Sequence, residues 1–169
     1  MSLGLILLIV VSILILFGAL QRVLDRMRLT DRQALLFTAL IFIGGLIPDI
    51  AFGEFFSINL GGAVVPFGLC VFLFIKAETG KEKLRAVLAA IIGGAVVFFT
   101  AKLMPAEPEQ IFIDPNYIYG IEAGLIAYIF GRSRRAAFIG GTMGVLLADL
   151  TQGIISFSNG INAKLALGG

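Results

Sequence analysis

The chain has 169 residues, of which 59% are hydrophobic and only 14% are charged, and its mean hydropathy is +1.01. A soluble domain of this size needs a polar surface, which this composition does not supply, so we expect a lipid bilayer as the main solvent. Histidine and tryptophan are absent, which excludes imidazole general bases, histidine-bound haem and most zinc sites.

Six apolar blocks follow one another along the chain, and short charged segments separate them. A helix needs about 20 mostly apolar residues to cross a hydrocarbon core of about 30 Å. The blocks comprise residues 3–20, 34–50, 58–75, 86–104, 117–131 and 136–155. We therefore predict an all-α fold, a polytopic transmembrane bundle of about six helices, in which residues 1–169 form a single integral membrane domain. The second and fifth blocks are short, and whether they fully span the bilayer is left open.

The first block predicts a retained membrane helix and not a cleaved signal peptide. A signal peptide begins with a basic segment and ends at a cleavage site of small residues. Here Met1 and Ser2 carry no basic side chain, and the nearest basic residues follow the block. We expect this helix to insert with its N-terminus outside.

Basic residues are concentrated in every second connection between the blocks. Of the thirteen Lys and Arg residues, four lie in the first of these connections, four in the second and three in the third. They are Arg22, Arg26, Arg28 and Arg32, then Lys76, Lys81, Lys83 and Arg85, and finally Arg132, Arg134 and Arg135. Because Lys and Arg in short loops stay in the cytoplasm, we predict a protein of the inner (cytoplasmic) membrane with cytoplasmic basic loops and the N-terminus outside.

Small residues four positions apart occur in the last two blocks, at Gly120 and Gly124 and at Gly140 and Gly144. Such spacing places small side chains on one face of a helix, where two backbones can approach closely. We therefore predict close packing between the fifth and sixth helices.

The second block ends in a segment that is typical of a broken or re-entrant helix. Pro48 cannot continue the backbone hydrogen bonding of a helix, and Asp49 follows it directly. Residues 52–66 then include Asn59, Gly61 and Gly62. Irregular backbone at membrane depth is tolerated only where it lines a cavity or is buried in protein. We predict an irregular or re-entrant turn near residues 48–66.

Three acidic residues lie inside the apolar blocks, namely Asp49, Glu122 and Asp149. A charge at the bilayer centre costs about 2.5–3.5 kcal/mol on insertion scales, so such residues persist mainly where they are paired, solvated or used. At about 1.5 Å per residue, Asp49 and Asp149 lie about 20 Å from the cytoplasmic boundary, and Glu122 reaches a comparable depth from the other side. We expect one acidic layer, with Glu54 and Asp114 at or beyond its outer edge.

The functional hypothesis is a site for a proton or a small cation that these three carboxylates form. Its candidate polar partners are Asn59, Asn116 and Gln152. The protein would then be a small ion- or proton-coupled transporter-like or channel-like protein with an acidic, outward-facing pocket. We expect no cofactor or metal and favour a role other than catalysis. The bilayer is the expected partner. We do not expect binding of nucleic acid, because the basic stretches are short and lack interleaved aromatic residues. Homo-oligomerisation is left open.

Two alternatives to this hypothesis stay open. In the first, Asp49 and Glu122 are solvated at the interface and Asp149 is a structural acid, so the protein is a non-catalytic membrane scaffold or assembly protein. In the second, Asp49 and Asp149 share a proton as the pair of an intramembrane aspartyl protease. Neither aspartate lies in the Gly-x-Gly-Asp or Tyr-Asp context that is typical of that class.

Two stretches of the chain resemble a known family. They are INLGGAVVP at residues 58–66, and GGTMG at 140–144 together with ADL at 148–150. Both resemble the uncharacterised prokaryotic multi-pass membrane proteins called domain of unknown function 1614, over most of the chain after residue 40. The resemblance implies a prokaryotic inner membrane and no established activity. In that family a Gly-rich segment with another Asp and a further apolar helix follow, whereas this sequence stops at residues 165–169, so we expect a shortened member or a fragment.

Overall fold

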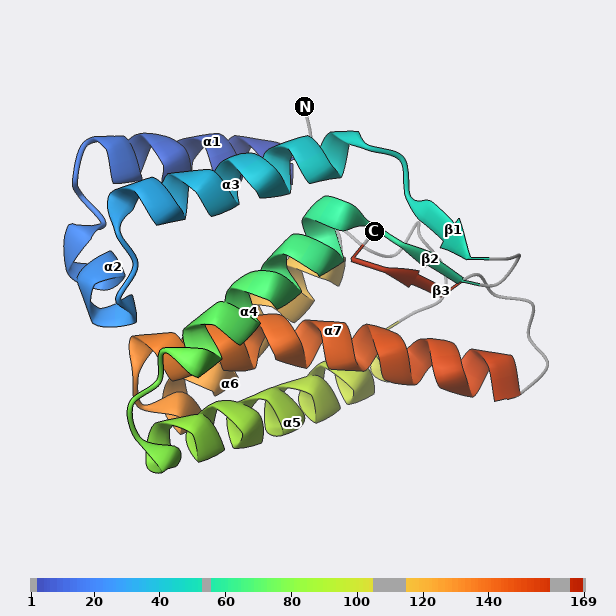
Figure 1. The fold of residues 1–169 in the computed structure, drawn as a ribbon. Helices are drawn as coiled ribbons and strands as arrows, with labels where there is room; N and C mark the ends of the chain where they lie inside the picture. Colours follow the sequence, from blue (N-terminus) through green and yellow to red (C-terminus); the bar gives the residue numbers. More distant parts are fainter. Residues whose placement is uncertain (1–2, 53–55, 105–114, 159–164, 169) are drawn as a thin grey trace.

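The structure is a computed structural model that describes residues 3–52, 56–104, 115–158 and 165–168 (Figure 1). These residues form seven α-helices, one short π-helix and three short strands. The helices are α1 (Leu3–Leu16), α2 (Gln21–Met27), α3 (Asp31–Leu46), η1 (Leu60–Val64), α4 (Val65–Ile75), α5 (Gly80–Leu103), α6 (Pro115–Gly131) and α7 (Arg134–Ser158). The strands are β1 (Ile50–Phe52), β2 (Phe56–Ile58) and β3 (Leu165–Leu167). The predicted helical class is confirmed, and the strands were not predicted.

Local signals in the sequence determine where the helices begin and end. Thr30 caps α3, since its Oγ1 accepts a hydrogen bond from the Gln33 N–H at 3.3 Å and Gln33 Oε1 accepts one from the Thr30 N–H at 3.2 Å. Thr79 caps α5 by accepting a hydrogen bond from the Glu82 N–H at 3.2 Å. α3 ends just before Pro48, because the residue ahead of a proline disfavours helical geometry.

The first apolar block bends before it ends. α1 stops at Leu16, and Gly18 adopts a φ of +72°, a left-handed conformation that glycine accepts without strain. α2 then runs at 91° to α1. The continuous helix predicted over residues 3–20 is therefore replaced by a shorter helix and a turn.

Two of the described helices are long and apolar enough to cross a membrane. They are α5 with 24 residues and α7 with 25 residues, and the bent pair of α1 and α2 adds a third if the pair is one span. The other apolar helices, α3, α4 and α6, have 16, 11 and 17 residues. The prediction of apolar spanning helices is supported for α5 and α7, and a total of about six spans stays a prediction.

The long helices α5, α6 and α7 form a bundle that packs through small residues. A Cβ added at Gly94 of α5 would lie 2.9 Å from the carbonyl oxygen of Gly144 in α7. A Cβ added at Gly140 of α7 would lie 2.6 Å from the Cβ of Ala89 in α5 and 3.1 Å from the Cβ of Ala127 in α6. The two backbones can approach this closely only where Cβ atoms are missing. A Cβ at Gly120 or Gly124 would meet no atom within 4 Å, so the close packing that we predicted depends on the glycines of α7.

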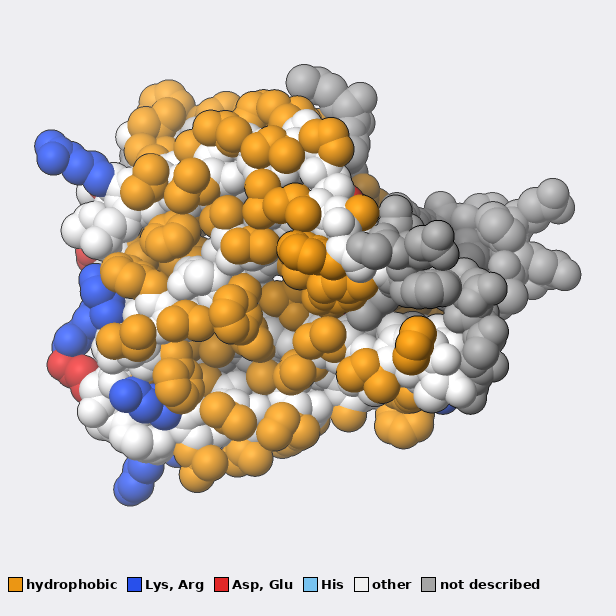
Figure 2. Space-filling model, turned by 45° about the vertical axis from the view of Figure 1, so that its right-hand side comes forward, with side chains coloured by type: hydrophobic (Ala, Val, Ile, Leu, Met, Phe, Trp, Pro, Cys, Tyr) orange, Lys and Arg blue, Asp and Glu red, His pale blue; other side chains and the backbone are white. Residues whose placement is uncertain are grey.

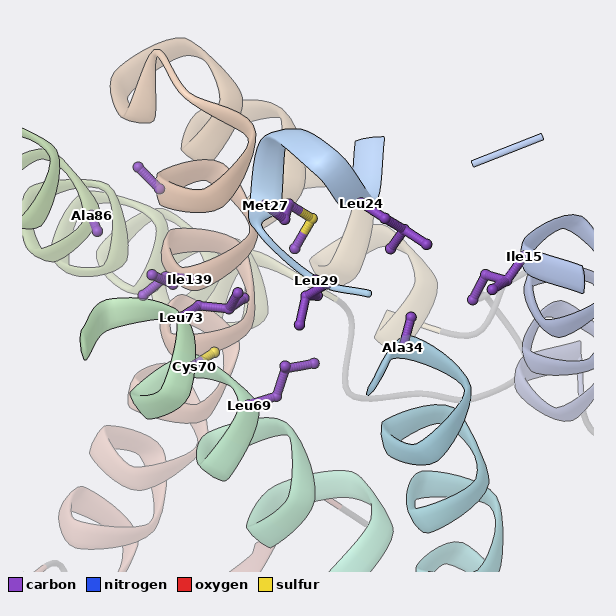
Figure 3. Packing of buried hydrophobic residues seen from close by; sticks show 11 residues of the cluster. Ile15, Leu24, Met27, Leu29, Ala34, Leu69, Cys70, Leu73, Ala86 and Ile139 are labelled. Carbon is purple, nitrogen blue, oxygen red and sulfur yellow. The ribbon is translucent and has the colours of Figure 1, made fainter. Parts of the chain in front are cut away.

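A hydrophobic cluster joins the N-terminal helices to this bundle (Figure 3). Leu73 and Cys70 of α4 are 0% and 2% exposed and lie at its centre. Met27 and Leu29 reach it from α2 and the segment after it, and Ile139 reaches it from α7. The cluster therefore attaches the first three helices to α4 and α7.

A small sheet occupies the segment for which we predicted an irregular or re-entrant turn. β1 and β2 pair antiparallel, with Ile50 opposite Ile58, and β3 pairs parallel with β2. Ser57 in the central strand is 1% exposed. The chain is thus interrupted between α3 and α4 as expected, and the described strands of this interruption pair through their backbones, as buried peptide groups require.

Apolar side chains cover the helical body, and charged side chains gather at one end of the face that Figure 2 shows. Phe99, Leu125 and Ile154 of the bundle helices are 62%, 60% and 64% exposed. Soluble monomers rarely expose apolar surface over such an extent. A surface of this kind fits hydrocarbon better than water.

Candidate functional site

Asp49 and Asn59 face each other where the chain leaves α3 and returns toward α4. The antiparallel pairing of Ile50 with Ile58 brings the residues on either side of the β1–β2 pair together. Asn59 Nδ2 donates a hydrogen bond to Asp49 Oδ1 at 2.8 Å, and Asn59 Oδ1 accepts one from the Gly62 N–H at 2.7 Å. The second bond determines which end of the amide faces Asp49. Two of the candidate residues are thus in direct contact.

Asp149 is tied to the same region through the C-terminal strand. This half-buried carboxylate of α7 accepts a hydrogen bond from the Gly168 N–H. Gly168 has a φ of +70° and packs against Gly62 so closely that neither glycine has room for a Cβ. The Asn59 N–H also donates to the Leu167 carbonyl oxygen at 3.0 Å. A continuous series of contacts therefore runs from Asp49 through Asn59, Gly62 and Gly168 to Asp149.

A cavity of about 370 Å³ lies beside this series of contacts, between α1, α3 and η1. Asn59 is its polar side chain. The other lining residues are Gly4, Leu5, Leu8, Ile41, Phe42, Gly45, Leu46, Gly61, Gly62 and Gly168. A cavity of this size has room for several water molecules or a small hydrated ion next to the Asn59 amide.

Glu122 lies in a different place, within the packing of α5, α6 and α7. Its Oε1 accepts a hydrogen bond from Thr100 Oγ1 at 2.9 Å. Its Oε2 is buried and has no hydrogen-bond partner among the described residues. In the described part of the chain, no hydrogen bond joins Glu122 to Asp49 or Asp149. Asp49 and Asp149 thus both contact the region around the sheet, whereas Glu122 contacts Thr100, and the common membrane depth of the three acids stays a prediction.

The remaining candidates lie at the edges of these two places. Gln152 is exposed on α7, and no hydrogen bond connects it to Asp149 in the residues that the structure describes. Asn116 is exposed at the start of α6. Glu54 and Asp114, which we expected at the outer edge of the layer, lie outside the described residues. Among the residues described, no three acids or thiols are grouped so as to hold a metal ion, so a cation near Asp49 would need backbone or amide oxygens as further ligands.

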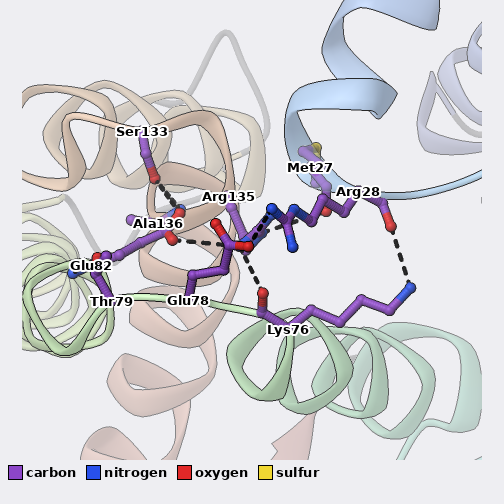
Figure 4. A network of polar contacts seen from close by, with 9 residues as sticks. All are labelled: Met27, Arg28, Lys76, Glu78, Thr79, Glu82, Ser133, Arg135 and Ala136. Atoms are coloured by element: carbon purple, nitrogen blue, oxygen red, sulfur yellow. Dashed lines mark hydrogen bonds and ion pairs between the residues drawn. The ribbon is translucent and has the colours of Figure 1, made fainter.

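A polar network at the opposite end of the molecule was missed by our sequence reasoning (Figure 4). Arg135, at the start of α7, is 4% exposed. Its Nη1 donates to the Lys76 carbonyl oxygen at 2.9 Å and lies 3.3 Å from Glu82 Oε2, and its Nε donates to the Met27 carbonyl oxygen at 3.4 Å. Ser133 Oγ donates to the other oxygen of Glu82 at 2.9 Å. The sequence offered one indication of this network, because Glu82 is an acidic residue within a basic segment.

The three basic connections meet at this end. Arg28 forms an ion pair with Glu78 of the second connection, and Lys76 Nζ donates to the Arg28 carbonyl oxygen at 3.3 Å. Arg134 Nη1 of the third connection donates to the Arg22 carbonyl oxygen at 2.7 Å. Loops that we assigned to one side of the membrane thus lie together. Which side of a membrane they occupy stays a prediction.

Two described helices that are long and apolar enough to span a membrane, together with the exposed apolar surface, are typical of a membrane protein. The family model described as "Protein of unknown function (DUF1614)" matches residues 23–169, so the chain belongs to this family. The family that we inferred from residues 58–66 and 140–150 is thereby confirmed. No curated protein and no solved structure matches the chain. Because the family description states no activity, a function has to be argued from the site.

Proposed function

We propose that this protein is a multi-pass protein of the inner membrane that binds a proton or a small cation at Asp49, Asn59 and Asp149, in the manner of a small transporter or channel. The observation that carries this proposal is the continuous series of contacts from Asp49 through Asn59 and Gly168 to Asp149, beside a cavity. Intramembrane acids are most often retained for function, and here two acids from distant parts of the chain converge.

The proposed membrane arrangement follows from helix length and charge. α5 and α7 cross the bilayer, and the other apolar helices complete a bundle of about six spans. The end that carries Arg28, Lys76 and Arg135 faces the cytoplasm, because short basic loops stay there. Asp149 lies fourteen residues after Arg135 on α7, about 21 Å away at about 1.5 Å per residue, so the proposed site opens toward the outer side.

The chemistry of the site suits a positive charge. Asn59 engages Oδ1 of Asp49, which leaves Oδ2 of that carboxylate for a cation or a proton. The backbone changes from helix to strand to π-helix here, and interrupted helices in transporters offer carbonyl oxygens to small cations. We propose that Glu122 is a separate acid inside the bundle and that Asn116 and Gln152 are outer polar groups on the route to the site.

Ion flux in proteoliposomes tests this proposal. The purified full chain is reconstituted, a gradient of protons, Na⁺ or K⁺ is imposed in separate experiments, and decay of the gradient is followed with an indicator dye inside the vesicles. The Asp49→Asn and Asp149→Asn variants are expected to slow the decay at least about tenfold, the equivalent of about 1.4 kcal/mol. Asp25→Asn, which removes an exposed carboxylate of α2, is the matched control and should leave flux unchanged.

The same variants distinguish the alternatives. If vesicles that contain the wild-type protein lose the gradient no faster than protein-free vesicles, the transport proposal is wrong and the scaffold hypothesis gains support. A protease would cleave an added membrane peptide and lose this activity in both aspartate variants. The described contacts give that hypothesis no support, because Asp49 is held by Asn59 and Asp149 by the Gly168 N–H instead of by each other.

A further inference from the structure

A second pocket lies at the basic end of the molecule, far from the aspartates. It has a volume of about 700 Å³ and is lined by Arg26, Tyr128, Ile129, Arg132, Ser133 and Arg134. Arg26 comes from α2, and the other five residues come from the end of α6 and the turn into α7. Three arginines from two segments that are distant in sequence therefore line one pocket.

The three exposed arginines of this pocket differ from Arg28 and Arg135, which form ion pairs at the same end. Arg28 and Arg135 have the carboxylates of Glu78 and Glu82 as counter-ions. In the described part of the chain, no carboxylate forms an ion pair with Arg26, Arg132 or Arg134. The pocket thus carries three positive charges for which the described residues provide no ion-pair partner. An anion is the chemically complementary ligand.

The geometry of the pocket also holds its groups in place. Arg134 Nη1 donates to the Arg22 carbonyl oxygen at 2.7 Å, which fixes this guanidinium against α2. Ser133 is fixed by its hydrogen bond to Glu82 and by the Ala136 N–H, which donates to Ser133 Oγ at 3.0 Å. Two of the lining side chains, Ser133 and Arg134, are therefore held by contacts within the protein.

The wall of the pocket indicates which anion fits. Tyr128 and Ile129 of α6 are 69% and 65% exposed, so apolar surface adjoins the three guanidinium groups. A free inorganic ion makes no use of apolar surface, whereas a phospholipid offers a phosphate and an acyl chain side by side. Tyrosine is also typical of the zone where headgroups meet hydrocarbon.

We propose that this pocket binds the phosphate headgroup of an anionic phospholipid, with the acyl chains lying along Tyr128 and Ile129. The guanidinium groups of Arg26, Arg132 and Arg134 neutralise and hydrogen-bond the phosphate, as arginine does bidentately at other phosphate sites. The inference rests on the proposed membrane arrangement, in which this end borders the cytoplasmic leaflet, but it does not depend on ion transport.

Lipid binding to the purified full chain in detergent tests the inference. Dioleoyl phosphatidylglycerol is titrated and its binding is measured by native mass spectrometry, with dioleoyl phosphatidylcholine and inorganic phosphate as separate probes. The variant R26Q/R132Q/R134Q is expected to bind phosphatidylglycerol at least about tenfold more weakly. The control R32Q/K81Q/R85Q removes the same charge from exposed side chains outside the pocket and should bind within about twofold of wild type.

Equal weakening in the two triple variants would overturn the pocket, because binding would then follow net charge alone. Equal affinity for phosphatidylcholine, or displacement of the lipid by millimolar inorganic phosphate, would overturn the assignment to an anionic lipid. The double variant R26Q/R132Q keeps the Arg134 bond to α2 and serves if the triple variant fails to fold. The Asp149→Asn variant should bind the lipid as wild type does. The lipid-binding experiment therefore tests the pocket even if the protein does not transport ions.

Discussion

The Nη1 atom of Arg135 lies 3.3 Å from Oε2 of Glu82 at the end of the molecule where the three basic connections meet. The exposed fractions of the two side chains are 5% and 20%. The same guanidinium donates to the carbonyl oxygens of Lys76 and Met27, so a single side chain joins α2, the α4–α5 connection and α7. Removal of one partner from such a pair leaves a buried charge without its counter-ion.

Replacing Arg135 by Met is therefore expected to lower the free energy of unfolding by about 3 kcal/mol. Cys70 is free and 2% exposed, so a thiol-reactive dye reports thermal unfolding in detergent micelles. The matched control is Arg28→Met. Its ion pair with Glu78 has side-chain exposures of 52% and 62%, and such pairs contribute at most about 1 kcal/mol. Equal losses in the two variants would contradict the role assigned to Arg135.

Replacing Gly62 by Ala is expected to detach β3 from η1. A Cβ at Gly62 would overlap the Gly168 carbonyl group, and overpacking of this kind costs about 1–3 kcal/mol. The Asn59 N–H, which donates to Leu167 at 3.0 Å, should then exchange faster with deuterated solvent. Gly68→Ala in α4 is the control, because a Cβ there meets no atom within 4 Å. Unchanged exchange at Asn59 in the Gly62 variant would mean that the two glycines do not pack together.

Two substitutions at Asn59 separate its two hydrogen bonds. Asn59→Asp keeps an acceptor for the Gly62 N–H but places a second carboxylate against Asp49, so we expect a folded protein with ion flux reduced at least about tenfold. Asn59→Leu removes both bonds and should also lower the free energy of unfolding by about 1–3 kcal/mol. Flux in proteoliposomes and dye-detected unfolding are measured on both variants. Wild-type flux in the Asp variant would exclude Asn59 from the site.

The pair of Thr100 and Glu122 makes a separate prediction about stability. Thr100→Val removes the hydroxyl that donates to Glu122 Oε1 at 2.9 Å, and it leaves both carboxylate oxygens without a donor among the described residues. We expect a loss of about 1–3 kcal/mol in the free energy of unfolding. Adding Glu122→Gln to this variant replaces the charge by a neutral amide and should recover part of the loss. If the double variant is less stable than Thr100→Val alone, the carboxylate has a partner that this account misses.

The helical elements were predictable because their signals are local. Long apolar blocks predicted α5 and α7, and Pro48 predicted the end of α3, whereas the capping roles of Thr30 and Thr79 were recognised only in the structure. The early end of α1 depends on Gly18, and a glycine within an apolar run does not by itself indicate a turn. The strands were missed because each has only three residues, and because β3 pairs with β2, which is distant from it in sequence.

The candidate site was predictable in its residues but not in its grouping. Asp49 and Asn59 flank a segment that the Pro48 break already marked, and their contact follows once the two strands pair. The link to Asp149 depends on Gly168, and no periodicity in the sequence connects these residues. Glu122 shares an expected depth with the aspartates, but depth alone does not say which face of a helix carries a side chain.

The aspartate site and the basic end are expected to lie on opposite sides of one membrane, and cysteine accessibility tests this arrangement most directly. In a Cys70→Ala background, single cysteines replace exposed Ala51 of β1 or exposed Lys81 of α5. A membrane-impermeant maleimide is added to spheroplasts that express each variant. We predict that the cysteine at position 51 reacts in intact spheroplasts and the cysteine at position 81 only after permeabilisation. Labelling of position 81 in intact spheroplasts, or equal labelling of both positions, would contradict the account.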